Sequence, residues 1–225
     1  MHQTHIHVYL IPGMAAGPEI FENIHLPADR FKVTILEWMI PEDDESLEAY
    51  AKRMADRVDD PAGYLVGVSF GGVMAQEMKA FLPDAKVIII SSVKSRAELP
   101  MRFSLAKKSK IYQVLPTGLV VNSRNLRRFA IGPRSKKRLE LYDKFLSVRN
   151  KQYLDWAIKM MICWPRETAD PDVAHIHGDK DIVFPIKHIE GAAAIAGGTH
   201  AMVIYKAKSV TEQLIKLLNK GEVLG

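Results

Sequence analysis

The chain contains a single cysteine, Cys163, among its 225 residues, so it cannot form an intramolecular disulfide. This is typical of a reducing compartment, and Cys163 itself stands in an apolar stretch that predicts a buried thiol rather than a nucleophile. No apolar run approaches the roughly 18 residues that span a bilayer. Residues 1–10 lack the charged start and the long apolar run of a secretory signal. We therefore expect a cytoplasmic protein without a membrane span.

The sequence also lacks internal repeats, low-complexity linkers and a metal-binding pattern. Two histidine pairs, His5 with His7 and His175 with His177, alternate on expected strands, but no cysteine or carboxylate cluster completes either pair. We expect these histidines at exposed strand ends, and we expect no metal ion and no other cofactor. Hydrophobic residues make up 48% of the chain, which is enough for the core of one domain with an inserted subdomain.

A serine stands between two glycines directly after a strand-like segment. Residues 64–68 are mostly apolar, residues 67–71 read Gly-Val-Ser-Phe-Gly, and a helical pattern follows at once. In this strand–turn–helix setting, GxSxG forms a sharp turn that exposes the serine hydroxyl. A side chain at Gly67 or Gly71 would strain the turn, and the N-terminus of the next helix favours negative charge nearby. The pattern predicts Ser69 as a nucleophile; taken alone, it also fits an ordinary loop.

An acid and a histidine follow Ser69 along the chain. Residues 173–185 contain a short apolar strand, a glycine turn with Asp179 and Asp181, and a closing proline. His200 stands on a glycine-rich loop just before the last expected helix. A serine hydroxyl needs a base to remove its proton, and the base needs an acid that fixes its tautomer. We therefore expect His200 to be the base and one of the two aspartates to be the acid.

The order of serine, acid and histidine, together with the surrounding motifs, resembles the α/β-hydrolase superfamily, as in a small, capped, carboxylesterase-like serine hydrolase. The resemblance runs from Ile6 to the expected C-terminal helix. Its marks are Pro12-Gly13-Met14, Gly67-Val68-Ser69-Phe70-Gly71, Gly178-Asp179-Lys180-Asp181 and Gly197-Gly198-Thr199-His200.

The resemblance also implies roles for single residues. In relatives the acid follows the glycine of its strand by three residues, which favours Asp181 and leaves Asp179 as a turn residue. It implies an oxyanion hole formed by the backbone amides of Met14 and Phe70. Relatives usually have His-Gly where this chain has Pro12-Gly13. Because a backbone N–H does not depend on that histidine, we expect the oxyanion hole to be retained.

Strand-like and helix-like segments alternate along the chain. The strands are expected at residues 5–11, 33–38, 63–68, 86–90, 172–177 and 191–196, and the helices at 18–24, 45–58, 70–82 and 201–219. This pattern predicts an α/β fold with a doubly wound, mainly parallel sheet of about six strands. The resemblance leads us to expect a minimal version of the fold without the first two strands of larger relatives. We expect a core of residues 1–93 and 169–225, with a helical cap of residues 94–168 inserted after the fourth strand.

The expected cap contains helical patterns around residues 139–149 and 153–161. In relatives such an insertion covers the serine and lines the substrate pocket. Candidate pocket walls are Trp38, Met14, Met101, Phe103 and Trp156, although each also suits a plain core position. Residues 94–151 carry 16 Lys or Arg and 3 Asp or Glu, a balance of +13 in a chain of net charge +5. This charge fits either a solvated surface or an anionic substrate or carrier.

Two classes of function stay open. The resemblance implies a serine hydrolase that cleaves a carboxylic ester or thioester through an acyl-enzyme on Ser69. The alternative is a non-hydrolytic or degenerate member of the same fold, such as a lyase or a ligand-binding protein. The pI of about 9.2 raises nucleic-acid binding as a third class, but no RNA or DNA motif supports it. We therefore expect a small-molecule ester or thioester as the partner, while the sequence does not indicate the oligomeric state.

Overall fold

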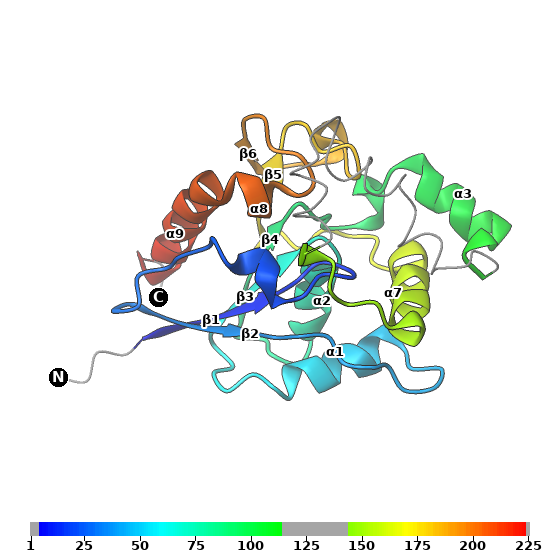
Figure 1. Ribbon diagram of the computed structural model, residues 1–225, viewed down its shortest axis with the longest axis horizontal. Coiled ribbons are helices and arrows are strands. Elements are labelled where there is room, and N and C mark those ends of the chain that lie inside the picture. The colour runs from blue at the N-terminus through cyan, green and yellow to red at the C-terminus, as the bar shows by residue number, and fades with distance from the viewer. Residues whose placement is uncertain (1–4, 114–143, 224–225) are drawn as a thin grey trace.

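The computed structural model of the protein describes residues 5–113 and 144–223. Within these residues lies a parallel sheet of six strands in the order β2-β1-β3-β4-β5-β6 (Figure 1). The strands are β1 (Ile6–Ile11), β2 (Phe31–Ile35), β3 (Tyr64–Val68), β4 (Lys86–Ile90), β5 (Ala174–Gly178) and β6 (Ala193–Ile195). The chain adds β2 on one side of β1 and the later strands on the other side. This is the doubly wound topology that the alternating sequence pattern predicts.

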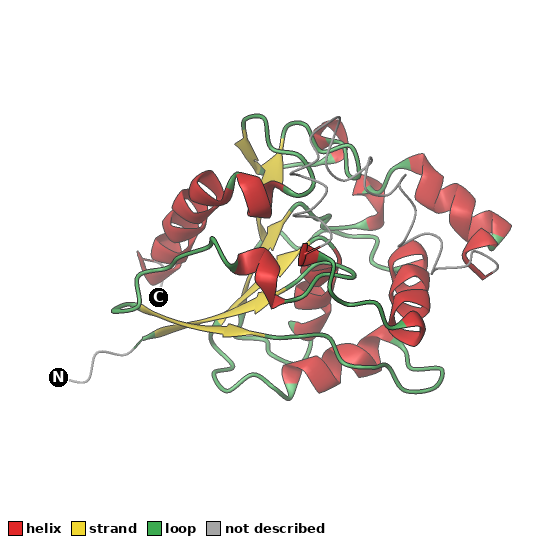
Figure 2. Ribbon diagram, viewed as in Figure 1, coloured by secondary structure: helices red, strands yellow, loops and turns green. Residues whose placement is uncertain are grey.

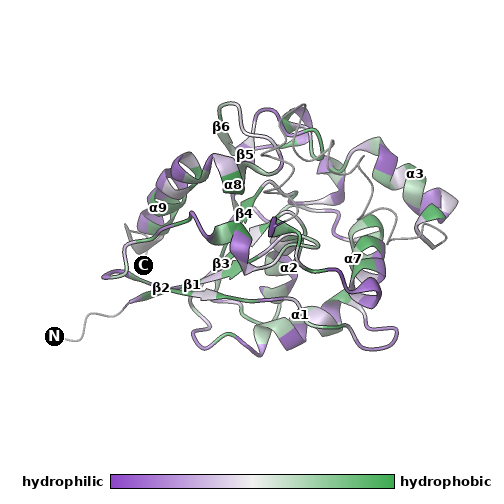
Figure 3. Ribbon diagram, in the orientation of Figure 1, coloured by the Kyte–Doolittle hydropathy of each residue, from purple (hydrophilic) through white to green (hydrophobic). Residues whose placement is uncertain are grey.

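The central strands are apolar because both faces of the sheet are covered. All five residues of β3 are buried, as are four of the five in β4. Successive side chains of β3 point to opposite faces, so Leu65 and Val66 belong to two different core clusters. Figure 3 shows these strands mainly in the hydrophobic colour, whereas the outer helices are mixed. Burial on two faces explains why these strands lack the alternation of a half-exposed strand.

Helices lie on both sides of the sheet (Figure 2). The α-helices are α1 (Leu47–Ala55), α2 (Phe70–Met78), α3 (Met101–Ser109), α7 (Lys151–Cys163), α8 (Met202–Tyr205) and α9 (Ala207–Val223). Short 3-10 helices are η1 (Pro18–Phe21), η2 (Arg96–Glu98), η3 (Ile111–Gln113) and η4 (Ile186–His188). One core cluster joins the sheet to α1, α2 and α7, and the other joins it to η1, α8 and α9. No helix within these residues combines the length and apolar character needed to cross a bilayer.

Helix α1 shows how local sequence starts and places an element. The side chain of Ser46 accepts a hydrogen bond from the backbone N–H of Ala49, which caps the first turn. Tyr50, Ala51 and Met54 form one fully buried stripe on the helix. This apolar face packs against α2, which follows the serine turn.

Two helices differ from the sequence prediction. The helix expected at 18–24 is only the four-residue η1. The helix expected at 201–219 is divided into α8 and α9, because Lys206 adopts a non-helical backbone (φ −114°, ψ 24°). An apolar period continues across such a break, so the pattern does not reveal it.

The segment between β4 and β5 contains η2, α3, η3 and α7. The second expected helix of this segment is α7. Of the first expected helix, residues 139–143 lie outside the described part of the chain, and residues 146–150 are not helical. Residues 145–148 lie beside the loop after β1, since the N–H of Gly17 bonds to the carbonyl of Phe145 and that of Val148 to the carbonyl of Ala15. The division into core and cap remains a prediction.

Candidate active site

Ser69 occupies a strained turn between β3 and α2. Its backbone has φ 53° and ψ −119°, outside the regions that most residues adopt. The turn is tight, because a Cβ at Gly67 would lie 2.1 Å from the carbonyl oxygen of Gly71. The N–H of Ser69 bonds to the carbonyl of Ile90, and its carbonyl accepts a hydrogen bond from the hydroxyl of Ser92. These contacts hold the serine in its strained conformation at the carboxyl end of β3.

The structure brings Ser69, His200 and Asp181 into one hydrogen-bonded chain. The Oγ of Ser69 lies 2.9 Å from Nε2 of His200, and Nδ1 of His200 lies 2.9 Å from Oδ2 of Asp181. Because the carboxylate accepts from Nδ1–H, Nε2 is left to accept the serine proton. The Asp181 side chain is fully buried, whereas that of His200 is 15% exposed at the edge of a pocket.

Asp181 is held as a carboxylate by its surroundings. Its Oδ1 accepts the backbone N–H groups of Val183 and Phe184, at 2.8 and 2.9 Å. Burial alone raises the pKa of Asp181, but the charge and hydrogen bond of His200 and the amide of Phe184 bring it below the ordinary value. Asp179, by contrast, accepts the backbone N–H of Gly197 in an exposed hydrogen bond.

The expectation of exposed strand ends was wrong for His175 and His177. Both are buried in β5, with 3% and 0% of their surface exposed. The Nε2–H of His177 donates to the carbonyl of Phe184 (2.8 Å), so its Nδ1 accepts from Nε2–H of His175 (3.0 Å). Strand β5 lies between β4 and β6 and is therefore not an edge strand, and most of its residues are buried. The alternation of His175 and His177 in the sequence does not reveal this position. The pair supports the turn that holds Asp181.

An apolar pocket of about 320 Å³ opens beside Ser69 and His200. Its walls come from the loop after β1, from α3 and α7, from the stretch around Phe145 and from α8. Apolar lining side chains include Ile20, Phe103, Phe145, Leu146, Leu154, Ile158, Met161, Ile162, Phe184 and Ile204. Acyl chains and other apolar groups fit such a lining.

Of the five expected pocket walls, the structure places Met14 and Phe103 in this pocket. Trp38 instead donates its indole N–H to the carbonyl of Gly13, and Trp156 is buried with its N–H on the carbonyl of Glu45. Met101 is 77% exposed, since α3 buries none of its residues. Each tryptophan N–H needs a buried partner, and those partners turn both rings into the core.

Neither a protein-family model nor a curated protein matches the chain. Solved structures do. A carboxylesterase of Nitrososphaera gargenis is similar with a TM-score of 0.72 at 15% identity, over 96% of this chain and 91% of its own. A thermophilic esterase of Thermogutta terrifontis gives 0.69 at 17% identity, over 96% and 90%. A bromoperoxidase of Bacillus anthracis gives 0.68 at 20% identity, over 97% and 93%. The protein has the α/β-hydrolase fold.

In this α/β-hydrolase fold, Met14 and Phe70 both line the pocket beside Ser69. Phe70 is the first residue of α2, where backbone N–H groups lack helical partners. Trp38 fixes the carbonyl of Gly13, the residue before Met14, at 3.0 Å. An oxyanion hole at these two amides remains a prediction.

The sequence patterns did not predict several residues that surround Ser69 and His200. Phe184 packs edge-on against His200, with ring centroids 5.3 Å apart, and also against Phe103. A weak signal existed, because Phe184 lies three residues after Asp181 and before a proline. Phe145 gave no such signal. The described part of the chain has no group of three or more His, Cys, Asp or Glu side chains that could hold a metal ion.

Proposed function

We propose that the protein is a serine hydrolase that cleaves a carboxylic ester or thioester through an acyl-enzyme on Ser69. The observation that carries this proposal is the hydrogen-bonded chain from Ser69 Oγ through His200 to Asp181. It combines a nucleophile, a base and an acid that orients the base. The similar carboxylesterase and esterase structures support the same reaction class.

In the proposed reaction, His200 takes the proton of Ser69 as the hydroxyl oxygen attacks the substrate carbonyl. The buried carboxylate of Asp181 stabilises the imidazolium that forms. The amides of Met14 and Phe70 are proposed to donate to the developing oxyanion, each contributing about a hundredfold or more in rate. His200 then protonates the leaving alcohol or thiol, and water activated by the same ring hydrolyses the acyl-enzyme.

The apolar pocket beside Ser69 suits the acyl part of the substrate. It is lined by side chains of the segment between β4 and β5, including Phe103, Leu154 and Met161. We therefore propose that residues 94–168 act as a cap that selects the acyl group, and that residues 1–93 and 169–225 form the core. An anionic substrate belongs to the same proposal, because the sequence of this segment is strongly basic.

A non-hydrolytic protein on the same fold is the alternative, and covalent labelling separates the two. We expect a fluorophosphonate probe to label the wild-type protein at Ser69. We also expect the wild-type protein to hydrolyse methyl esters or thioesters of short fatty acids. Ser69→Ala should lose labelling and reduce kcat by about a millionfold, because the nucleophile is removed. Its melting temperature should stay close to wild type, which is the control for folding. Turnover retained in Ser69→Ala would rule out the acyl-enzyme.

A further inference from the structure

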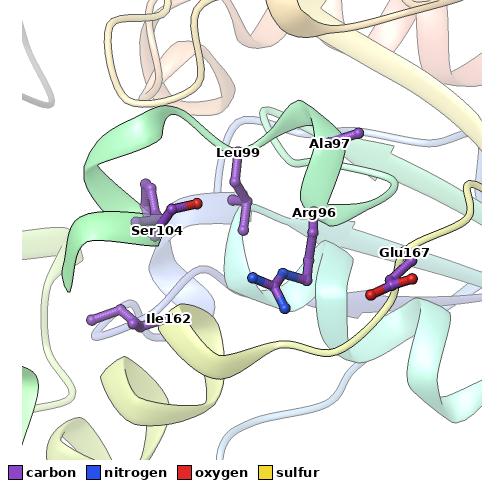
Figure 4. Close-up of a pocket in the computed structure, with 7 residues that line it drawn as sticks. Arg96, Ala97, Leu99, Ser104, Ile162 and Glu167 are labelled. Carbon is purple, nitrogen blue, oxygen red and sulfur yellow. The ribbon is translucent and has the colours of Figure 1, made fainter. Parts of the chain in front are cut away.

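A second hollow of about 260 Å³ lies next to the Ser69 pocket, at the carboxyl end of β4 (Figure 4). It shares two walls, Phe103 and Ile162, with the Ser69 pocket. Its remaining lining differs in character, since it includes the charged side chains of Arg96 and Glu167. The two hollows are therefore neighbours, one apolar with the nucleophile and one with a guanidinium.

Among the residues that the structure describes, the partly buried guanidinium of Arg96 has no protein partner. Figure 4 shows its guanidinium extending from η2 into the space between the labelled residues. Within the described part of the chain, this guanidinium forms no ion pair and no hydrogen bond. The nearby Arg166 differs, because its guanidinium is bound by the carboxylate of Glu77 at 3.0 Å. A guanidinium presents five N–H donors in a planar fork, so Arg96 has its donors available for a ligand.

The backbone around Arg96 is fixed before any ligand binds. The N–H of Arg96 bonds to the carbonyl of Arg166 at 2.9 Å, which joins η2 to the segment after α7. The buried carboxylate of Glu98 accepts the N–H groups of Lys94 and Glu190, which joins η2 to the loop after η4. A ligand at this position therefore meets a preorganised site and does not have to order the loop.

We propose that Arg96 binds a carboxylate at the far end of the substrate, so that the preferred substrate is an ester or thioester whose acyl chain ends in a carboxylate. This inference rests on the proposed function. The ester lies at Ser69, the apolar chain passes Phe103 and Ile162, and the terminal carboxylate meets the guanidinium of Arg96. A guanidinium matches a carboxylate through two parallel hydrogen bonds. Glu167 lies across the same hollow and repels anions, which favours a singly charged carboxylate over a doubly charged phosphate.

The turnover test compares monomethyl esters of dicarboxylic acids, from four to ten carbons, with methyl esters of the matching monocarboxylic acids. The measured quantity is the ratio of kcat/KM for the acidic ester to that for the neutral ester. We expect a maximum at one chain length, because the distance from Ser69 to Arg96 is fixed. Arg96→Gln should lower this ratio about ten- to hundredfold, as expected for a lost charge-assisted hydrogen bond. Glu167→Gln should raise it, because a repelling charge is removed.

A matched control is Lys32→Gln, which removes one positive charge from an exposed position on β2. It should leave the ratio unchanged. An equal fall of the ratio in Lys32→Gln and Arg96→Gln would overturn the proposal, because net charge and not the site would then explain it. No effect of Arg96→Gln on the ratio would overturn it as well.

A binding test separates this inference from the proposed function. Calorimetry on Ser69→Ala measures the affinity for each ester without turnover, and on Ser69→Ala with Arg96→Gln it isolates the contribution of Arg96. We expect the acidic ester to bind at least tenfold more tightly than the neutral one, and Arg96→Gln to remove that difference. Absent turnover in the wild type, with this difference intact, would overturn only the hydrolase. Equal affinities, or tighter binding of a phosphate-ended ester, would overturn the carboxylate site.

Discussion

Two aspartates two positions apart have different surroundings. Asp181 is buried and accepts three hydrogen bonds, from His200, Val183 and Phe184, whereas Asp179 bonds to the N–H of Gly197 at the surface. Asparagine at position 181 has one acceptor oxygen instead of two, so it cannot accept both from Nδ1–H of His200 and from the two backbone amides in the way the carboxylate does. It also carries no charge to stabilise the imidazolium. The two positions therefore offer a matched pair of substitutions.

Asp181→Asn should lower kcat by about ten-thousandfold, because the ring of His200 adopts the wrong tautomer and loses its counter-charge. Asp179→Asn should change kcat less than about tenfold. Steady-state kinetics with a neutral ester measures both, and the melting temperature of each variant controls for folding. The reversed order of effects would assign the acid to Asp179.

The buried histidines of β5 make the stability depend on pH. Burial lowers the pKa of His175 well below its ordinary value, and the neighbouring His177 and Lys94 lower it further. Burial also lowers the pKa of His177, although the Phe184 carbonyl and Asp181 act in the opposite direction. As the pH falls through the ordinary histidine range, the unfolded chain takes up protons on these rings more readily than the folded chain does. The free energy of unfolding therefore falls with falling pH, by up to about 1.4 kcal/mol per pH unit for each histidine.

His175→Phe should make this dependence shallower, because the phenyl ring cannot bind a proton. The lost hydrogen bond to His177 changes the free energy of unfolding at every pH, so the quantity to compare is the slope of that free energy against pH. Urea unfolding at pH 5, 6 and 7 gives the slope for wild type and variant. Equal slopes in the two proteins would contradict a neutral, buried His175.

The sequence predicted some residues of the site well and others badly. Ser69, Asp181 and His200 each stand in a short motif whose spacing determines the local turn, and the structure places all three together. The pocket walls depend instead on which elements pack side by side. Phe103 and Trp38 are both aromatic residues with apolar and charged residues nearby in the sequence, and only the folded chain decides which of them faces the pocket.

At the level of elements, the turn between β3 and α2 depends on contacts with β1. A Cβ at Gly71 would lie 2.4 Å from the carbonyl oxygens of both Ile11 and Pro12. Real Cβ atoms do not approach backbone so closely, so a side chain would push α2 away from the sheet. Gly13 lies in the same region, but a Cβ there would meet its nearest atoms at 3.6 Å, which is ordinary contact.

Gly71→Ala should therefore lower the free energy of unfolding by on the order of 3 kcal/mol, and Gly13→Ala should change it by less than about 1 kcal/mol. Denaturant unfolding of both variants measures the difference. Similar losses would mean that the backbone near Ser69 can move apart, contrary to the tight turn.

The sequence predicted the elements because their patterns are local. β3 and β4 are continuous apolar segments, and the glycine turn ends β3 at once. The β6 strand is shorter than expected, since only Ala193–Ile195 pair with β5. The course of residues 145–148 depends on hydrogen bonds to the distant loop after β1. No period in the sequence records such contacts.

At the scale of the whole molecule, charge is unevenly divided along the chain. Residues 94–151 have a balance of +13 and the chain as a whole has +5, so the remainder carries −8. Within the described residues of this segment, α3 has no buried residue and carries Arg102, Lys107 and Lys108. A field from many like charges acts over about 30 Å at 0.01 M salt and about 10 Å at 0.1 M. This field acts on a charged substrate as it approaches the protein, whereas the proposed contact with Arg96 acts on the substrate once it is bound.

This difference predicts two separable salt effects. Raising ionic strength from about 0.01 to 0.5 M should lower kcat/KM for the acidic esters by roughly tenfold or more and leave that for neutral esters nearly constant, because salt screens steering of anions. Arg96→Gln removes one charge of 16 basic residues in this segment. The variant should therefore keep most of the salt dependence of kcat/KM for acidic esters, while it loses the preference for acidic over neutral esters at every ionic strength. If acidic and neutral esters responded alike to salt, the basic segment would be a solvated surface, and any preference for acidic esters would be due to the local contact at Arg96.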